Sequence, residues 1–523
     1  MEIPGALFAA FAVGTAIVIW FWKAQHKPTD FPLIGTTETD SSYAKAAESF
    51  AKDSHAVLSE GLKRCKGPFR VATATGPKVV LPPRYLDDIK SDDRFSFAHE
   101  MAKVGMHFQC KMVRDARLIR NDKQSLSHLP GFEAFATPLH NNIFQDTIKI
   151  KITQSLGAIT ESLSEETTLS LKDLIGDSPE WKECIVGKTA LDLTTRLSTR
   201  VFLGEKFARD QNWLGLSLAY TMTAMHAAQA VLKWPPILQR PANRFLPQCI
   251  QQRAMLQSIR DILEPEIKQR KDTREASLEA GKTPPTSKDT LDWMDEISRG
   301  RPFDLVLGQL QLGFVAIHTT SMLLTDVLLE LCAHPEYVPR LREEIIRVLR
   351  EDGWKKTSMY KLKRVDSFIK ETLRLNPQSM ITARRMTTET VLLPDGTKLP
   401  KGTSTMIPTR IVMLDPHIYP DPTSFDGERF FRQRTESETR AQLVTANIEY
   451  LGFGYGKHAC PGRFLAANEI KVALCHLLLK YDFRFVDGES RPEPLVWETA
   501  YMTNPNVKVL VRRRMEEMDL SMA

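Results

Sequence analysis

The sequence contains few cysteines, and they are widely spaced. The 523 residues include seven cysteines, an odd number, and no two of them form a C-x-x-C pair. This distribution argues against a disulfide framework and against a structural zinc site. The sequence also lacks an N-x-S/T acceptor for N-glycosylation. Both absences fit a domain that faces a reducing cytosol.

A strong charge of either sign is lacking as well. The formal net charge is +6, and the charged residues are spread along the chain, which argues against a nucleic-acid-binding protein. No internal repeat and no clear linker divides the chain. Hydrophobic residues make up 42% of it, which is ample for a large core. We therefore predict one large domain, although length alone suggests about two to four.

One long uncharged run is present, close to the N-terminus. No charged residue occurs from Ile3 to Trp22, and about twenty apolar residues span a bilayer core. A cleaved signal peptide is the alternative, but the run is long for one, lacks a basic start and shows no clear small-x-small site. Lys23 and Lys27 follow the run, so the positive-inside rule places the rest of the chain in the cytosol.

These features predict a division of the chain into three parts. Residues 1–27 would form a single membrane-spanning anchor. Residues 28–66 would form an elbow and leading segment, stiffened at its start by Pro28 and Pro32. Residues 67–523 would form the main domain.

Local patterns predict mostly helices, with short strands near both ends of the domain. The polar stretch 268–290 contains Pro284-Pro285 and is expected to be an exposed connection. The expected elements are strands at Phe69–Thr73, Lys78–Leu81 and Val507–Val511, the first two forming a hairpin around Gly76-Pro77, and helices at 143–163 and 181–203.

The most apolar long segment of the domain runs from Pro302 to Pro335. Proline near the start and just past the end is typical helix punctuation. Polar and charged side chains interrupt the segment, which favours a long buried helix over a second membrane span. In its middle, His318, Thr319 and Thr320 are adjacent. Such side chains need partners or a polar cavity, unless the threonines bond back to the preceding turn.

A further helical pattern carries Glu371 and Arg374, which lie three residues apart and share one face. An exposed pair of this kind is common and contributes little to stability. A buried pair needs additional hydrogen bonds, which a second arginine could provide. Arg429 is a candidate for that role.

A glycine-rich loop from Gly452 to Phe464 contains Cys460, and an apolar helical run follows from Leu465 to Leu474. A sulfur just before a helix receives backbone N–H groups and faces the positive helix end, both of which favour a thiolate. The glycines would let the backbone approach something flat and bulky. Such a sulfur suits the axial ligand of a haem iron. The alternative is an ordinary buried thiol in a glycine-rich turn.

The loop matches the pattern F-x-x-G-x-x-x-C-x-G in full, at Phe453, Gly456, Cys460 and Gly462. It resembles the haem-binding loop of the cytochrome P450 superfamily. The glutamate-x-x-arginine helix, the later aromatic-arginine segment and the threonine-bearing helix also occur in the order typical of that superfamily. The sequence around Thr319 and Cys460 is similar to that of fungal microsomal members that oxidise terpenoids and related secondary metabolites.

The resemblance implies a mainly α fold with small β-sheets at one edge, behind one N-terminal transmembrane helix. It also implies haem b, iron protoporphyrin IX, with Cys460 as the proximal ligand and Phe453 packed near it. His458 and Arg384, with Arg385 as a rival, would contact the haem propionates. A basic residue and a tryptophan of the family's early helix are not recognisable between 140 and 151, so one propionate partner stays unassigned.

On the other side of the haem, the resemblance makes Thr319 the alcohol beside bound dioxygen, with Ala316 and Thr320 bordering the distal pocket. Here His318 replaces the family's common acidic residue, and Ala316 replaces a common glycine. Two interpretations of His318 are open: a neutral side chain with a structural hydrogen bond, or a proton relay that titrates near neutrality. The buried cluster that supports the proximal side would comprise Glu371, Arg374 and Arg429.

The implied function is a haem-thiolate monooxygenase that inserts one oxygen atom from O2 into a hydrophobic small molecule. Electrons would come from NADPH through a cytochrome P450 reductase, with cytochrome b5 as a further partner, at the endoplasmic reticulum membrane. The catalytic domain would face the cytosol, with membrane lipid as a partner and no nucleic acid. Two alternatives are an isomerase or dehydratase of the same fold, to which His318 lends weight, and a membrane-tethered haem sensor or carrier.

Overall fold

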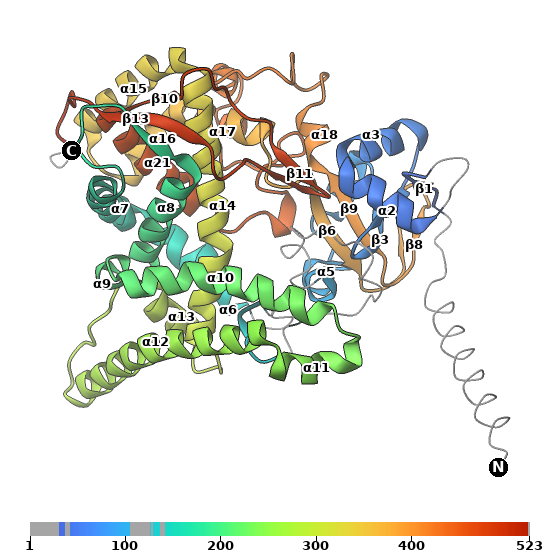
Figure 1. The fold of residues 1–523 in the computed structure, drawn as a ribbon, viewed down its shortest axis with the longest axis horizontal. Helices are drawn as coiled ribbons and strands as arrows, with labels where there is room; N and C mark the ends of the chain where they lie inside the picture. The colour runs from blue at the N-terminus through green and yellow to red at the C-terminus, as the bar shows by residue number, and fades with distance from the viewer. Residues whose placement is uncertain (1–30, 37–41, 105–125, 127–128, 136–141, 521–523) are drawn as a thin grey trace.

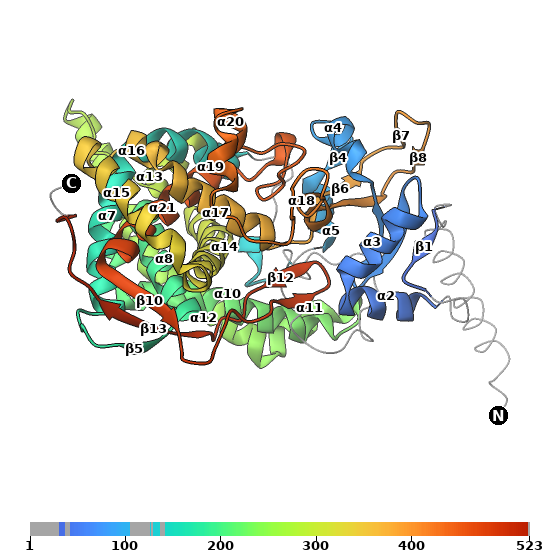
Figure 2. The same cartoon turned by 90° about the horizontal axis from the view of Figure 1, so that it is seen from above.

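The computed structural model describes residues 31–36, 42–104, 126, 129–135 and 142–520. The fold is mainly helical, with the largest sheet at one end of the molecule (Figure 1). A second, three-stranded sheet lies at the opposite end in both views (Figures 1 and 2), so the sheets are not confined to one edge as expected. The anchor predicted at Ile3–Trp22 lies outside the described residues.

The largest sheet has six strands in the order β1-β2-β3-β9-β6-β4. Its strands are β1 (Leu33–Ile34), β2 (Phe69–Thr73), β3 (Gly76–Val80), β4 (Phe95–Ser96), β6 (Ile381–Thr387) and β9 (Ser404–Pro408). β2 and β3 pair antiparallel, with Phe69 opposite Val80, which confirms the predicted hairpin. β3 and β9 pair parallel, with Val79 opposite Thr405.

The segment before residue 67 packs on this sheet. β1 pairs with β2, and the helices α2 (Tyr43–Lys52) and α3 (Ser54–Arg64) pack on this part of the sheet. Buried Phe50, Leu58 and Phe69 share one apolar cluster. A Cβ at Gly61 would lie 2.2 Å from the Phe69 ring, so glycine is required where α3 meets β2. The described part of the leading segment therefore shares a core with residues beyond 67.

The remaining helices form the body of the molecule. Those before the centre of the chain are α4 (Leu86–Ile89), α5 (Phe97–Val104), α6 (Ile143–Asp146), the π-helical turn η6 (Thr147–Ile152), α7 (Thr153–Leu174), α8 (Val186–Leu203), α9 (Glu205–Ala208), α10 (Gln211–Leu232), α11 (Pro236–Phe245) and α12 (Pro247–Glu279). Those that follow are α13 (Thr290–Ser298), α14 (Leu305–Ala333), α15 (Val338–Asp352), α16 (Lys356–Lys361), α17 (Lys363–Leu375), α18 (Thr409–Met413), α19 (Arg429–Gln433), α20 (Glu438–Ala441) and α21 (Arg463–Lys480).

The smaller sheets include the predicted C-terminal strand, which is confirmed as β13. The three-stranded sheet has the order β10-β13-β5, and two hairpins pair β11 with β12 and β7 with β8. Their bounds are β5 (Lys182–Ile185), β7 (Val391–Leu392), β8 (Lys398–Leu399), β10 (Tyr481–Phe485), β11 (Leu495–Trp497), β12 (Ala500–Met502) and β13 (Lys508–Arg513).

Two predictions of local structure are corrected. The start of the helix expected at 181–203 is instead β5, because Lys182–Ile185 pairs with the distant strand β13. The stretch 268–290 is expected to be an exposed connection, but it is helical up to Glu279, where α12 ends. Ion pairs of Arg270 with Asp289 and of Arg274 with Asp295 join this polar helix to the segment of α13. Such pairs can hold a helix that has little apolar surface.

The predicted long helix is confirmed as α14, which runs through the middle of the molecule (Figure 1) and is seen nearly end-on in Figure 2. It packs against α8, α17 and α21. Its N-cap is Asp304 and not the proline at position 302. The Asp304 carboxylate accepts the N–H of Leu307. Among the described residues, α14 alone is long and apolar enough to cross a membrane, but 61% of its most apolar window is buried inside the protein. It is therefore a core helix.

Candidate active site

Cys460 lies in the loop just before α21, as predicted. Its backbone N–H donates to the carbonyl oxygen of Phe453 at 2.8 Å, which closes the loop. Burial raises the pKa of the Cys460 thiol, and hydrogen bonds from the backbone N–H groups of Gly462 and Arg463 oppose this effect. The side chain is nevertheless accessible to solvent. A thiol that is both accessible and surrounded by protein lines an interior space rather than the outer surface.

The glycines of this loop have different roles. Gly456 has φ +74°, and a Cβ there would lie 2.5 Å from the backbone of Lys90. The next residue, Lys457, donates its N–H to the Lys90 carbonyl at 3.1 Å. Gly456 thus lets the loop pack on the residue after α4, and its contact with a flat ligand stays a prediction. A Cβ at Gly462 would meet no atom within 4 Å, so close approach of a ligand remains a prediction for that position.

His458 lies beside a group of basic side chains. Its ring centroid is 6.0 Å from that of Phe97, and the Arg385 guanidinium lies 5.4 Å from the same Phe97 ring. Burial, together with the positive charges of Arg385, Lys457 and Lys149, lowers the pKa of His458 to about 4. The imidazole is therefore neutral at pH 7 in these surroundings, and an anion placed beside it would raise its pKa. The predicted basic position is basic in type but uncharged in this setting.

The two candidate arginines of β6 face different surroundings. The register of β6 with β9 shifts between Thr382 and Arg385, and burial lowers the pKa of both Arg384 and Arg385 to about 10. The charges of Glu100 and Glu498 act on Arg384 and oppose this lowering. Arg385 lies with His458 instead. Arg385 is buried whereas Arg384 is partly exposed, so the choice between these two arginines as the propionate partner stays a prediction.

Lys149 is a basic residue that the sequence interpretation missed. It lies in η6 and contributes to the positive charge felt by His458. The sequence interpretation left one propionate partner unassigned in 140–151, and Lys149 occupies that stretch. A π-helical turn changes the residue spacing along a helix face. A search at ordinary α-helical spacing therefore could not place this side chain.

Glu371, Arg374 and Arg429 form a buried cluster. Arg374 donates to both carboxylate oxygens of Glu371, at 2.7 and 2.8 Å, and Arg429 Nε donates to Glu371 Oε1 at 3.1 Å. Glu371 and Arg374 are fully buried. Arg374 Nη1 also donates to the carbonyls of Met413 and Pro422, at 2.8 and 2.7 Å. The cluster therefore joins α17 to the irregular segment that leads toward the cysteine loop.

Lys370 also holds this side of the molecule together and was not predicted. Its ammonium donates to the carbonyls of Arg440 and Gln442, at 2.7 and 3.0 Å. It lies 4.3 Å from the ring centroid of Phe430 and 4.4 Å from that of Tyr450. Burial lowers the pKa of Lys370 to about 7. A lysine on a helix usually suggests a solvated face, so no local signal separated this residue from exposed lysines.

The centre of α14 presents one accessible face. Val315 and Thr319 are exposed and lie one helical turn apart, although most of the helix around them is buried. The Thr319 hydroxyl donates to the Val315 carbonyl at 2.9 Å, the back-bonded arrangement considered from the sequence. Ala316 is partly exposed, whereas Thr320 is 5% exposed. The accessible face thus carries Thr319 and not Thr320.

His318 is mostly shielded from solvent, and burial lowers its pKa from 6.5. It is therefore neutral at pH 7. This supports the neutral interpretation over the relay, because a residue that relays protons at neutrality needs a pKa near 7.

The comparisons with known proteins decide the family. A sequence profile described as Cytochrome P450 matches residues 155–511. The chain is a cytochrome P450. Three fungal relatives share its length: cytochrome P450 monooxygenase adrA of Penicillium rubens is 38% identical, covering 94% of this chain and 93% of adrA. Monooxygenase trt6 of Aspergillus terreus is 37% identical, over 97% of this chain and 99% of trt6. Monooxygenase pyr3 of Aspergillus fumigatus is also 37% identical, over 98% of this chain and 97% of pyr3.

Haem is the cofactor that membership of the cytochrome P450 family implies, and the residues present fit it. Cys460 offers an accessible sulfur with two backbone N–H donors. Buried Arg385 lies near His458 and Lys457, a set of donors suited to the anionic propionates. In the described part of the chain, no group of three or more His, Cys, Asp or Glu side chains could hold a metal ion. A haem needs only one protein ligand, so this cytochrome P450 does not require such a group.

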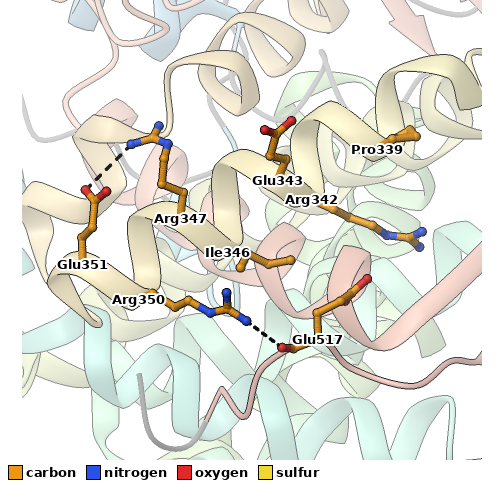
Figure 3. A pocket seen from close by; sticks show the side chains of 8 residues that line it. All are labelled: Pro339, Arg342, Glu343, Ile346, Arg347, Arg350, Glu351 and Glu517. Carbon is orange, nitrogen blue, oxygen red and sulfur yellow. Dashed lines mark hydrogen bonds and ion pairs between the residues drawn. The ribbon is translucent and has the colours of Figure 1, made fainter.

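An open recess elsewhere on the cytochrome P450 does not belong to this site. Side chains of α15, including Arg342 and Ile346, line it together with Glu517 (Figure 3). It contains none of the residues described above. Its polar lining consists mainly of charged surface side chains: Arg347 pairs with Glu351, and Arg350 donates to the backbone carbonyl of Glu517. It therefore offers no chemistry for oxygen transfer.

Proposed function

We propose that this monooxygenase oxidises a hydrophobic small molecule, a terpenoid or a related fungal secondary metabolite. One oxygen atom of O2 enters a C–H or C=C bond, and the other leaves as water with two electrons and two protons. The electrons come from NADPH through a cytochrome P450 reductase, with cytochrome b5 as a second donor. The observation that carries the proposal is Cys460, accessible and supplied with N–H donors at the start of α21.

Different side chains have different roles in the proposed reaction. Haem b supplies the oxygen chemistry when bound, with the thiolate pushing electron density towards O–O cleavage. Cys460 would hold the iron, while His458 and Arg384, or its rival Arg385, would donate to the propionates. The Thr319 hydroxyl can both donate and accept a hydrogen bond, so it can pass a proton towards oxygen. The buried parts of α14 keep the surrounding space dry.

The test is expression with a reductase, feeding of a terpenoid panel and mass spectrometry under isotopically labelled O2. One labelled oxygen atom in the product supports the proposal. A product without label indicates the isomerase or dehydratase, and NADPH-independent haem binding without product indicates the sensor. The neutral His318 gives the first of these alternatives no particular support.

Thr319→Ala should uncouple the cytochrome P450. NADPH is still consumed, but more of it ends as peroxide and less as product, because the accessible hydroxyl that moves the proton is gone. A general acid–base group contributes about 10²- to 10⁴-fold, so we expect product per NADPH to fall by at least about tenfold. The measurement is product, peroxide and NADPH in one reaction.

Two matched variants on the same helix make this result specific. His318→Ala should uncouple less, because its side chain is neutral and less exposed than that of Thr319. Thr320→Ala should uncouple least, because its side chain is buried. Unchanged coupling in Thr319→Ala would remove the residue from the mechanism. Stronger uncoupling in His318→Ala than in Thr319→Ala would make the histidine the principal proton donor.

Membrane association at the endoplasmic reticulum, with the catalytic domain in the cytosol, is part of the proposal. The apolar run Ile3–Trp22 supports it. So do large apolar side chains exposed at and beside α11: Ile237 is 86% exposed, Phe245 73% and Trp234 44%. Lys233 and Arg244 lie among them. An apolar surface bordered by basic residues suits the headgroup region of a bilayer.

Deleting residues 1–22 should weaken membrane association while leaving the haem spectra largely intact, because the run precedes the folded core. Cell fractionation with a carbonate wash provides the measurement. Residual binding that carbonate removes is expected from the α11 surface. Retention of all the truncated protein in the carbonate-resistant fraction would show that residues 1–22 are not the only integral anchor.

A further inference from the structure

One side chain from outside α14 binds the helix at its accessible face. Gln378 donates its side-chain amide Nε2 to the Thr319 carbonyl oxygen at 2.5 Å. Gln378 lies in the connection between α17, which carries Glu371 and Arg374, and β6, which carries Arg385. A helix carbonyl already accepts the N–H four residues on. The amide therefore adds a second, external donor at the residue whose hydroxyl faces the accessible space.

The connection that carries Gln378 is itself held by the β11–β12 hairpin. The Tyr501 N–H donates to the Gln378 carbonyl at 3.4 Å, and the Met380 N–H donates to the Thr499 carbonyl at 2.8 Å. Ser379 and Ala500 form a β-bridge between these two contacts. The backbone of Gln378 thus belongs to the hairpin, while its side chain reaches the helix.

The turn of the hairpin is fixed at its other side. Glu498 has φ +48°, accepts the Ala74 N–H at 3.0 Å and donates its own N–H to the Ala51 carbonyl at 3.2 Å. These contacts anchor the hairpin to the end of the molecule that holds the large sheet. Gln378 therefore connects this anchored unit directly to α14.

We propose that Gln378 is a positioning residue that couples the β11–β12 hairpin to the Thr319 turn of α14. The proposal rests on the proposed function, because positioning Thr319 matters only if its hydroxyl moves protons. The Thr319 hydroxyl is bound to the Val315 carbonyl one turn earlier, so a displacement of this turn of the helix moves the hydroxyl with it. A substrate that displaces the hairpin would move Gln378 and would change how Thr319 faces the reacting oxygen.

Gln378→Leu tests the proposal, because leucine has a similar size and cannot donate. Amide hydrogen exchange should become about two- to tenfold faster in the turn after Thr319, the range expected for the loss of one hydrogen bond. Product per NADPH should fall by a similar factor, which is less than in Thr319→Ala. The carbon monoxide difference band should be retained, because the variant does not touch the cysteine loop.

Two further variants separate hydrogen bonding from packing. Gln378→Glu keeps the shape but directs a carboxylate at the carbonyl, and should lose at least as much coupling as Gln378→Leu. Ser379→Ala removes a hydroxyl that bonds to Ile381 at the start of β6, donating to its carbonyl at 2.9 Å and accepting its N–H at 3.4 Å, and should behave as wild type. Full coupling in Gln378→Glu, or an equal loss in Ser379→Ala, would overturn the proposal.

The two readouts distinguish this proposal from the proposed function. If wild type forms labelled product and Gln378→Leu matches it in both exchange and coupling, the positioning role is wrong and the monooxygenase stands. If wild type forms no labelled product, the proposed function fails and the catalytic meaning of the coupling fails with it. Faster exchange in Gln378→Leu would then show a purely structural bond.

Discussion

Cys460→Ser should abolish the carbon monoxide difference band of sulfur-ligated ferrous haem. Serine has nearly the same shape, but its oxygen does not supply the soft, electron-rich ligand that produces this band. The N–H groups of Gly462 and Arg463, which now face sulfur, would remain. We therefore expect a folded protein whose spectrum changes completely and whose oxidation of substrate falls to background. The measurement is the reduced, carbon-monoxide-treated difference spectrum of purified protein.

Cys65→Ser is the matched control, because this cysteine is the C-cap of α3, packs against the apolar cluster of the large sheet and is only partly buried. The carbon monoxide difference band of Cys65→Ser should equal that of wild type. If Cys460→Ser also retained the band, another side chain would be the iron ligand. Circular dichroism of both variants separates the loss of the ligand from the loss of the fold.

Glu371→Ala should cause a collapse in the yield of haem-loaded protein. Removing this carboxylate leaves Arg374 and Arg429 without their shared anionic partner, and Arg374 is fully buried. Breaking a buried ion pair by removing one partner costs about 3–5 kcal/mol. Total stability of a domain is only about 5–15 kcal/mol, so the loss is a large fraction of it. The measurements are soluble yield, haem content per polypeptide and the unfolding midpoint.

A surface pair provides the comparison. Arg347 and Glu351 lie 3.8 Å apart on α15 with about half of each side chain exposed (Figure 3). Exposed pairs at this spacing contribute about 0.3–0.5 kcal/mol, so Glu351→Ala should retain normal yield and haem content. A stable, haem-replete Glu371→Ala protein would show that the carboxylate does not support the proximal side.

The cysteine loop and the long helix could be predicted because their signals are local. The spacing of Phe453, Gly456, Cys460 and Gly462 identifies the loop, and the mainly apolar content of α14, interrupted by a few polar side chains, predicts a buried helix. The predicted hairpin at β2 and β3 depends on alternation around a turn, which is local as well. The β5 strand could not be predicted this way, because its partner β13 lies more than 300 residues away.

Several residues of the site needed the folded chain. The choice between Arg384 and Arg385 depends on a register shift in β6 and on the distant Glu100 and Glu498. Lys149 joins the basic group through a π-helical turn. Gln378 reaches Thr319 only because the α17–β6 connection lies against α14. None of these contacts has a local pattern.

The sequence by itself determined the family, the iron ligand to test and the threonine-bearing helix, since each depends on residue type and short-range spacing. The tertiary structure alone decided that Thr319 is accessible while Thr320 is buried, and that His458 and His318 are neutral at pH 7. Accessibility and pKa depend on which distant groups surround a side chain. Desolvation and charge act through space, so segments far apart along the chain set them together.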